Sequence, residues 1–215
     1  FTSFRFIVFL VLAAAAYFLT PKRCRWVTLF VANYVFYFIS GGRIFIYLLA
    51  TTVTTYLATV KIGDMAAKNK IAFNEAKAEL DKEGKKAWKA AFAKKKKRIL
   101  IPTLLFNFGI LAVLKYSGFV TENLNLLFAK IGIETELPVF RFLLPLGISF
   151  YTFQSMGYLI DVYREKQEPE RNFCKLALFI SFFPQIVQGP ISRFGTLAEQ
   201  LFRANEFSYT RIKFG

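Results

Sequence analysis

The chain has 215 residues, of which 55% are hydrophobic and 18% aromatic, and it carries a formal net charge of +15. An ordinary soluble domain is only about 45–50% apolar and a disordered chain is poor in aromatic residues, so both classes are excluded. The sequence contains no histidine and two cysteines, Cys24 and Cys174. It therefore supplies no histidine base or histidine metal ligand, and it has too few cysteines for a disulfide framework or a four-cysteine zinc site.

The apolar residues are gathered in six long runs. These runs are Phe4–Thr20, Trp26–Ser40, Ile44–Val60, Ile99–Ser117, Val139–Ile160 and approximately Leu176–Ile191. A helix that crosses the hydrocarbon core of a bilayer needs about 20 mostly apolar residues. The sequence therefore predicts an all-α, polytopic transmembrane protein with about six membrane segments. Since no small-residue cleavage site precedes Pro21, we expect the first run to be a membrane anchor rather than a signal peptide.

Basic residues in the short connections predict the orientation. Lys22, Arg23 and Arg25 follow the first run, and cytoplasmic loops are enriched in Lys and Arg. We therefore expect a multi-pass protein of the plasma membrane, with its N-terminus and the loop Gly118–Pro138 outside the cell. The expected division of the chain is 1–60 (three N-terminal transmembrane helices), 61–98 (a basic cytoplasmic segment) and 99–215 (further transmembrane helices).

The segment 61–98 contains 13 Lys and Arg against five Asp and Glu. Phe73, Leu80 and Ala87 recur every seven residues and lysines occupy the opposite side, which predicts a basic amphipathic helix. Beside membrane spans, such a helix is typical of a segment that lies on the anionic inner leaflet of the lipid bilayer. A helix that binds a partner protein is the alternative, and nucleic acid is not an expected partner.

Polar residues interrupt the fifth apolar run. Ser149, Thr152, Gln154 and Ser155 fall on one side of a helix. Polar groups within the hydrocarbon layer are costly, which makes them candidate functional residues, although packing between helices through small and hydroxyl residues explains them equally well. At the cytoplasmic end of the run, Asp161 lies three residues before Arg164, a spacing at which the two can pair.

The sixth run contains two prolines, Pro184 and Pro190, and does not fit a straight lipid-facing helix. Non-helical backbone at membrane depth is tolerated only where it is buried in protein or lines a water-filled cavity. The sequence therefore predicts a broken or re-entrant segment beside a cavity. Arg193 is a candidate for binding a phosphate or carboxylate, with snorkelling to the interface or pairing with Glu199 as alternatives.

Two motifs carry a family resemblance. The stretch LPLGISFYTFQ at 144–154, continued by YLIDVYR at 158–164, resembles the signature of the membrane-bound O-acyltransferase (MBOAT) family. The motif at 182–194, with FFPQ followed by GP, is similar to the same family. The opening FTSFRF and the pair Gly41-Gly42 fit the bacterial group of alginate O-acetyltransferases and D-alanyl-lipoteichoic-acid transfer proteins. The resemblance covers nearly the whole chain.

The resemblance implies an integral membrane enzyme of roughly twice this length. Such enzymes move an acyl group, here expected to be acetyl, from a cytoplasmic thioester donor such as acetyl-CoA towards a cell-wall or exported polysaccharide, directly or through an extracellular partner protein. No bound cofactor or metal is expected. The catalytic histidine of the family lies in a later apolar segment, so this chain corresponds to the N-terminal part without the catalytic part and is expected to be inactive alone.

By the same resemblance, six residues are expected to line the substrate funnel without being catalytic. They are Ser149, Gln154, Tyr158, Asp161, Gln188 and Arg193.

Two other functional classes stay open at this point. A transporter is also polytopic with broken helices, but it predicts an internal repeat with paired interrupted spans, and the sequence has one interrupted region. A non-catalytic membrane scaffold is favoured by the lack of histidine. A histidine in a further apolar segment of the gene product would distinguish the enzyme from the scaffold.

Overall fold

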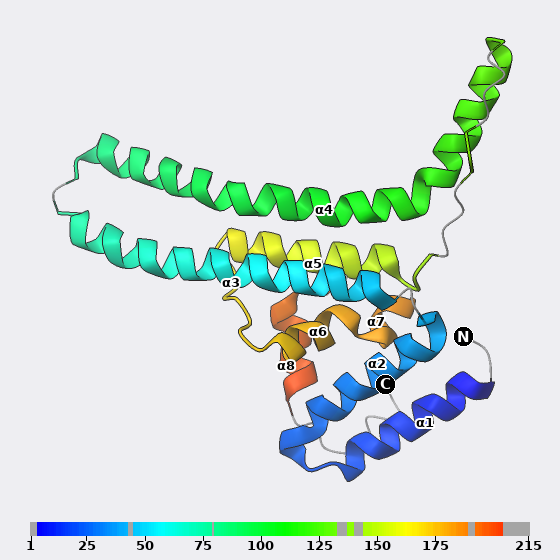
Figure 1. The fold of residues 1–215 in the computed structure, drawn as a ribbon. Helices are drawn as coiled ribbons and strands as arrows, with labels where there is room; N and C mark the ends of the chain where they lie inside the picture. The colour runs from blue at the N-terminus through cyan, green and yellow to red at the C-terminus, as the bar shows by residue number, and fades with distance from the viewer. Residues whose placement is uncertain are drawn as a thin grey trace.

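The computed structural model describes residues 4–42, 45–78, 80–132, 137–139, 144–188 and 192–203. Within these ranges every regular element is a helix, which confirms the predicted all-α class (Figure 1). The α-helices are α1 (Phe4–Leu19), α2 (Arg25–Gly41), α3 (Phe45–Ala76), α4 (Lys82–Lys130), α5 (Ile148–Tyr163), α6 (Phe173–Ser181), α7 (Phe183–Gln188) and α8 (Phe194–Phe202). A 3₁₀ turn, Lys22–Cys24, joins α1 to α2.

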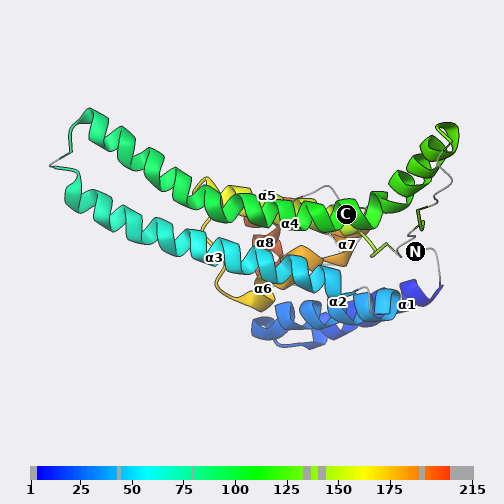
Figure 2. The same cartoon turned by 45° about the horizontal axis from the view of Figure 1, so that its top comes forward.

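The two longest helices form an antiparallel hairpin that projects beyond the rest of the bundle (Figures 1 and 2). Helix α3 has 32 residues and α4 has 49, and each contains a stretch long and apolar enough to cross a membrane. A helix of 32 residues is about 48 Å long, whereas the hydrocarbon core is about 30 Å thick. The apolar half of α3 can therefore span the bilayer while its basic half continues beyond it.

The segment 61–98, which we call the arm, is not one amphipathic helix, so this prediction is wrong. The chain reverses between Ala76 and Lys82, and the apolar side chains hold the two halves of the arm together. The rings of Phe73 on α3 and Trp88 on α4 lie 6.1 Å apart, centroid to centroid. The indole N–H of Trp88 donates a hydrogen bond to Asn69 Oδ1 at 3.0 Å, and Asp81 caps α4 by accepting from the Gly84 N–H at 2.7 Å.

The boundaries of two other predicted segments also differ. Helix α4 continues past Ser117 to Lys130, so the first part of the expected outer loop is helical. Helix α5 begins only at Ile148, after Gly147 in the left-handed region (φ 67°), whereas the fifth apolar run begins at Val139. The total of six membrane segments stays a prediction, because within the described ranges only α3 and α4 contain a stretch of full spanning length.

The core lies where α6 is enclosed by α2, α3, α5 and α8. Five consecutive residues of α6, Leu176–Ile180, are completely buried. A lipid-facing helix would leave one side exposed, so α6 is surrounded by protein instead. Helix α5 packs between α3 and α4 on one side and α6 on the other. The two family motifs touch where Gln154 meets Gln185 and where the ring of Tyr158 meets that of Phe194.

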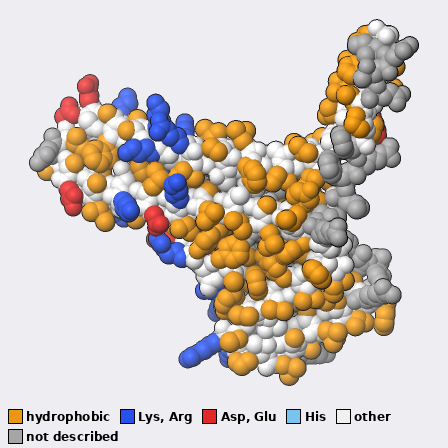
Figure 3. All heavy atoms as spheres, in the orientation of Figure 1, with side chains coloured by type: hydrophobic (Ala, Val, Ile, Leu, Met, Phe, Trp, Pro, Cys, Tyr) orange, Lys and Arg blue, Asp and Glu red, His pale blue; other side chains and the backbone are white. Residues whose placement is uncertain are grey.

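Large apolar side chains cover much of the outer surface (Figure 3). Leu12 on α1 is 64% exposed, Val31 on α2 52% and Leu105 on α4 68%. Soluble monomers rarely expose continuous apolar patches of this kind, whereas a bilayer solvates them. Most of the charged side chains visible in this view lie on the arm, where apolar side chains lie among them (Figure 3). This distribution, together with the apolar helices, indicates a membrane protein.

The sixth apolar run is broken, as the sequence predicts. Helix α6 ends at Ser181, and α7 starts at Phe183 after a single non-helical residue, Phe182, with φ −58° and ψ 96°. Pro184 contributes to the break because it has no N–H to donate to the carbonyl of Ile180. Gly189 and Pro190, the second helix-breaking pair, lie outside the described residues.

Candidate functional site

A pocket of about 260 Å³ lies between α5 and the residues that precede α8. Its lining consists of Gln154, Gly157, Tyr158, Ile160, Asp161, Ser192 and Arg193. Four of the six predicted lining residues are therefore brought to one pocket, from two segments about 30 residues apart in sequence. Spacing explains the α5 part, because positions 154, 157, 158 and 161 share one helix face.

Gln154, at the inner end of the pocket, is 3% exposed and holds the break between α6 and α7. Its Nε2 donates to the Phe179 carbonyl at 2.9 Å and lies 3.4 Å from Gln185 Oε1. In a continuous helix, the Phe179 carbonyl would accept from the N–H of Phe183. Gln154 therefore replaces a backbone donor that the break removes.

Asn33 on α2 satisfies the other half of the same broken bond. It is completely buried, and its Oδ1 accepts from the Phe183 N–H at 2.9 Å. A buried backbone group without a partner costs about 1–3 kcal/mol, so Asn33 stabilises the start of α7. Sequence reasoning missed this residue. The sequence feature that could have identified Asn33 is its position inside the second apolar run, where a polar side chain is costly.

Tyr158 forms the aromatic wall of the pocket. Its ring lies 4.7 Å from that of Phe194 on α8, and Phe194 lies 4.9 Å from Phe179 on α6. The Tyr158 hydroxyl oxygen accepts from the Glu170 N–H at 2.6 Å, which ties α5 to the loop leading into α6. Three helices and one loop therefore fix the orientation of this side chain.

Asp161 and Arg193 place opposite charges on the pocket. Asp161 is half-buried at the last turn of α5, and Arg193 is exposed at the N-cap of α8. Among the residues that the structure describes, no ion pair joins Asp161 to Arg164 or Arg193 to Glu199. A carboxylate accepts hydrogen bonds and a guanidinium donates them, so the two groups can orient a polar ligand that carries both kinds of partner.

The remaining predicted residues are not gathered at this pocket. Ser149 lies half-buried in the first turn of α5 and does not belong to the lining. Gln188 ends α7, and its side chain lies outside what the structure describes.

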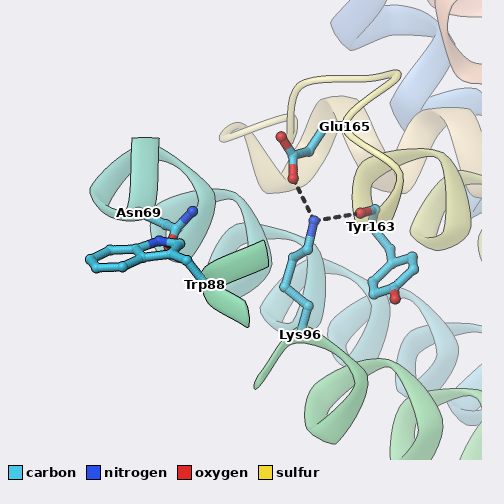
Figure 4. A network of polar contacts seen from close by, with 5 residues as sticks. All are labelled: Asn69, Trp88, Lys96, Tyr163 and Glu165. Carbon is cyan, nitrogen blue, oxygen red and sulfur yellow. Dashed lines mark hydrogen bonds and ion pairs between the residues drawn. The ribbon is translucent and has the colours of Figure 1, made fainter. Parts of the chain in front are cut away.

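A buried lysine joins the arm to the end of α5 (Figure 4). Lys96, on α4, is 6% exposed and donates to the Tyr163 carbonyl at 2.9 Å and to Glu165 Oε1 at 2.5 Å. Its Nζ also lies 4.8 Å from the centre of the Phe92 ring. Glu165 has a φ of 58°, a conformation that non-glycine residues adopt only at an energetic cost. The Lys96 contacts thus hold the turn that follows α5.

Comparisons with known proteins give a consistent picture. No family model matches the chain, and no solved structure matches it. The chain is 33% identical over 209 residues to the probable alginate O-acetylase AlgI of Azotobacter vinelandii, covering 96% of this chain and 36% of that protein. It is 31% identical over 209 residues to the protein of the same name from Pseudomonas aeruginosa, covering 96% and 34%.

A third relative is named for a different substrate. The chain is 30% identical over 142 residues to the peptidoglycan O-acetyltransferase of Helicobacter pylori, covering 54% of this chain and 26% of that protein. The chain thus spans about a third of the length of the curated alginate O-acetylases that it matches. These relatives agree with the resemblance carried by the motifs at 144–164 and 182–194. The chain belongs to the membrane-bound O-acyltransferase family, in the group of the alginate O-acetylases.

Proposed function

We propose that the protein containing this chain is a membrane O-acyltransferase that transfers an acyl group, most simply acetyl, to a hydroxyl of an exported or cell-wall polysaccharide. The names of the relatives support the reaction class. The observation that carries the proposal is the polar pocket beside the broken helix, because it places amide, phenol, carboxylate and guanidinium groups next to backbone that has left the regular helix.

The requirements of acyl transfer suggest which roles the residues of this pocket can have. Acyl transfer to a hydroxyl needs a base for the hydroxyl proton and hydrogen-bond donors for the developing oxyanion. Since the 215 residues contain no histidine, we assign the histidine base to another part of the protein and expect no activity from these residues alone. Asp161 and Arg193 then orient substrate at the pocket. Gln188 is the proposed oxyanion donor, and unchanged turnover in Gln188→Ala would refute that role.

The charge distribution supports a direction for the reaction. In the proposed topology of six membrane segments in the plasma membrane, the N-terminus lies outside and the arm lies in the cytoplasm. The acyl donor, acetyl-CoA or another acyl thioester, approaches from the cytoplasm, where the lysines between positions 85 and 98 and Arg164 can attract its phosphates. The acceptor polysaccharide, or an extracellular partner protein that passes the acyl group on, lies on the other side.

The test uses the complete protein in a host strain without its own copy of the gene. We expect Asp161→Asn and Arg193→Gln each to lower the acetyl content of the exported polysaccharide at least tenfold, at unchanged protein level in the membrane. Glu199→Gln, an exposed residue of α8 outside the pocket, is the matched control and should retain full acetylation. Full acetylation by both pocket variants would refute the assignment of this pocket to the reaction.

A further inference from the structure

A second hollow lies between α1 and α2, and it shares no lining residue with the pocket at α5. This groove measures about 490 Å³ and is lined almost entirely by apolar side chains. Ala13 and Ala16 form its wall on α1, and Val27, Val31 and Val35 form the wall on α2. Val31 is 52% exposed and Val35 43%, so the groove opens to the outer apolar surface and not to the core.

The length of the groove matches one leaflet of a bilayer. Its lining runs from Phe9 on α1 to Thr20, which follows α1, and from Cys24 at the end of the 3₁₀ turn to Val35 on α2. Eleven residues of helix rise by about 16 Å, which is half of a hydrocarbon core about 30 Å thick. A helix about 10 Å in diameter and 16 Å long occupies more than about 1,000 Å³, so a helix can cover this groove but cannot enter it.

Only one end of the groove is polar, and that end is basic. The hydroxyls of Thr20 and Thr28 lie 2.8 Å apart at this end. The 3₁₀ turn beside them carries Lys22 and Arg23, and Arg25 follows it. The first acidic residue in the sequence is Asp64, so all the charged side chains of residues 1–63 are basic.

We propose that the groove binds an anionic phospholipid, with one acyl chain between α1 and α2 and the phosphate at the basic turn. An acyl chain is narrow, apolar and about as long as one leaflet is thick, which fits the shape of the groove. The phosphate then lies where the chain emerges from the hydrocarbon layer, and basic sites between membrane helices bind anionic head groups in this way. Neither the pocket at α5 nor the proposed acyltransferase activity is needed for this inference.

The test measures lipid binding to the complete protein reconstituted in nanodiscs. Nanodiscs that contain phosphatidylglycerol and phosphatidylcholine with identical acyl chains are dissolved in mild detergent, and the lipid retained on the protein is counted by native mass spectrometry. We expect one phosphatidylglycerol to be retained in preference to phosphatidylcholine. Removing two charges in Lys22→Gln/Arg23→Gln should lower this preference by about fivefold for each charge while leaving the packing of the helices intact. Lys68→Gln/Lys77→Gln, two basic residues of the arm, is the charge control.

A second pair of variants tests the groove itself. Ala16→Leu fills the groove and should abolish retention, whereas Ala14→Leu makes the same change at an exposed position of α1 outside the lining and should leave retention unchanged. Equal retention of the two lipids by the wild type would overturn the anionic head group. Unchanged retention in Ala16→Leu would overturn the groove as the binding site.

Discussion

Gln154 and Asn33 lie on different helices, yet they satisfy the two halves of one broken backbone hydrogen bond. Gln154 donates to the Phe179 carbonyl at 2.9 Å, and Asn33 accepts from the Phe183 N–H at 2.9 Å. A single break in a buried helix therefore depends on α5 and α2 at once. Because Gln154 also lines the pocket, the geometry of the pocket is tied to the break.

The first prediction concerns Asn33. In Asn33→Ala the Phe183 N–H loses its partner in a buried environment, which should destabilise the protein by about 1–3 kcal/mol. The midpoint of thermal unfolding in detergent, followed by tryptophan fluorescence, measures the effect. Asn123→Ala is the control, because the Asn123 amide donates to the Phe119 carbonyl on the exposed surface of α4. Equal midpoints for the two variants would contradict the role of Asn33.

A double-mutant cycle tests whether the two side chains support the same break. If they do, Gln154→Ala should cost less in the Asn33→Ala background than in the wild type, since the break is already disturbed. The coupling free energy should exceed about 0.5 kcal/mol. Strict additivity would mean that the two hydrogen bonds act independently.

The second prediction concerns the ion pair between the arm and the turn after α5. The Lys96 side chain is 8% exposed and that of Glu165 is 58% exposed. Glu165→Gln removes the counter-charge of a buried ammonium, whereas Lys96→Met leaves a carboxylate that water can solvate. We expect Glu165→Gln to be the more destabilising variant, by about 1–2 kcal/mol. The same unfolding measurement ranks the two, and the reverse order would show that the ammonium is well solvated.

The third prediction concerns close packing between α3 and the loop that follows α5. A Cβ added at Gly63 would lie 2.3 Å from Pro169 Cγ, too close for the loop to keep its position. Gly63→Ala should therefore destabilise the protein by about 1–3 kcal/mol. Gly109 on α4 has nothing within 4 Å of an added Cβ, so Gly109→Ala should be neutral or stabilising by up to about 1 kcal/mol.

If Gly63→Ala instead melts at the wild-type temperature, the loop 164–172 accommodates the methyl group by moving. Such a movement should break the hydrogen bond from the Glu170 N–H to the Tyr158 hydroxyl. Tyr158→Phe removes the same hydrogen bond, so the two variants should then be compared.

The fourth prediction concerns the side of the membrane on which the turn between α1 and α2 lies. Cys24 is exposed, and the orientation proposed from Lys and Arg places it in the cytoplasm. In a Cys174→Ser background, a membrane-impermeant maleimide should label Cys24 only after the cells are permeabilised. Labelling of Cys24 in intact cells would invert the proposed topology. Lys130→Cys in a cysteine-free background is the control. Lys130 ends α4 on the side away from the arm, so this cysteine should be labelled in intact cells.

The sequence predicted the helical class and the broken sixth run, because hydropathy and proline are local signals. Pro184 shows how such a signal works, since the break lies two residues before it. The residues that the structure gathers at the pocket were expected only from the family resemblance, and their role in lining a substrate funnel stays a prediction. The residue that accepts the hydrogen bond from the Phe183 N–H at the break could not be predicted. Asn33 and Phe183 are 150 residues apart in sequence, and their contact depends on how α2 packs against α6.

The arm shows why a periodic pattern can mislead. Phe73, Leu80 and Ala87 fit one helical face, but the chain turns between Ala76 and Lys82 and uses its apolar residues inside a hairpin. The sequence did contain a local sign of the second helix. Asp81 is a favourable N-cap residue, and it accepts from the Gly84 N–H as such residues do.

The continuity of α4 has a mechanical consequence. The helix runs unbroken from the tip of the arm through Lys96 into its apolar stretch, and Lys96 holds the carbonyl of Tyr163, two residues beyond Asp161. The arm and the end of α5 are therefore joined at Lys96, and α5 is the helix that contributes Asp161 to the pocket. A macromolecule that tilts the arm must either break the contacts of Lys96 or carry the end of α5 with it.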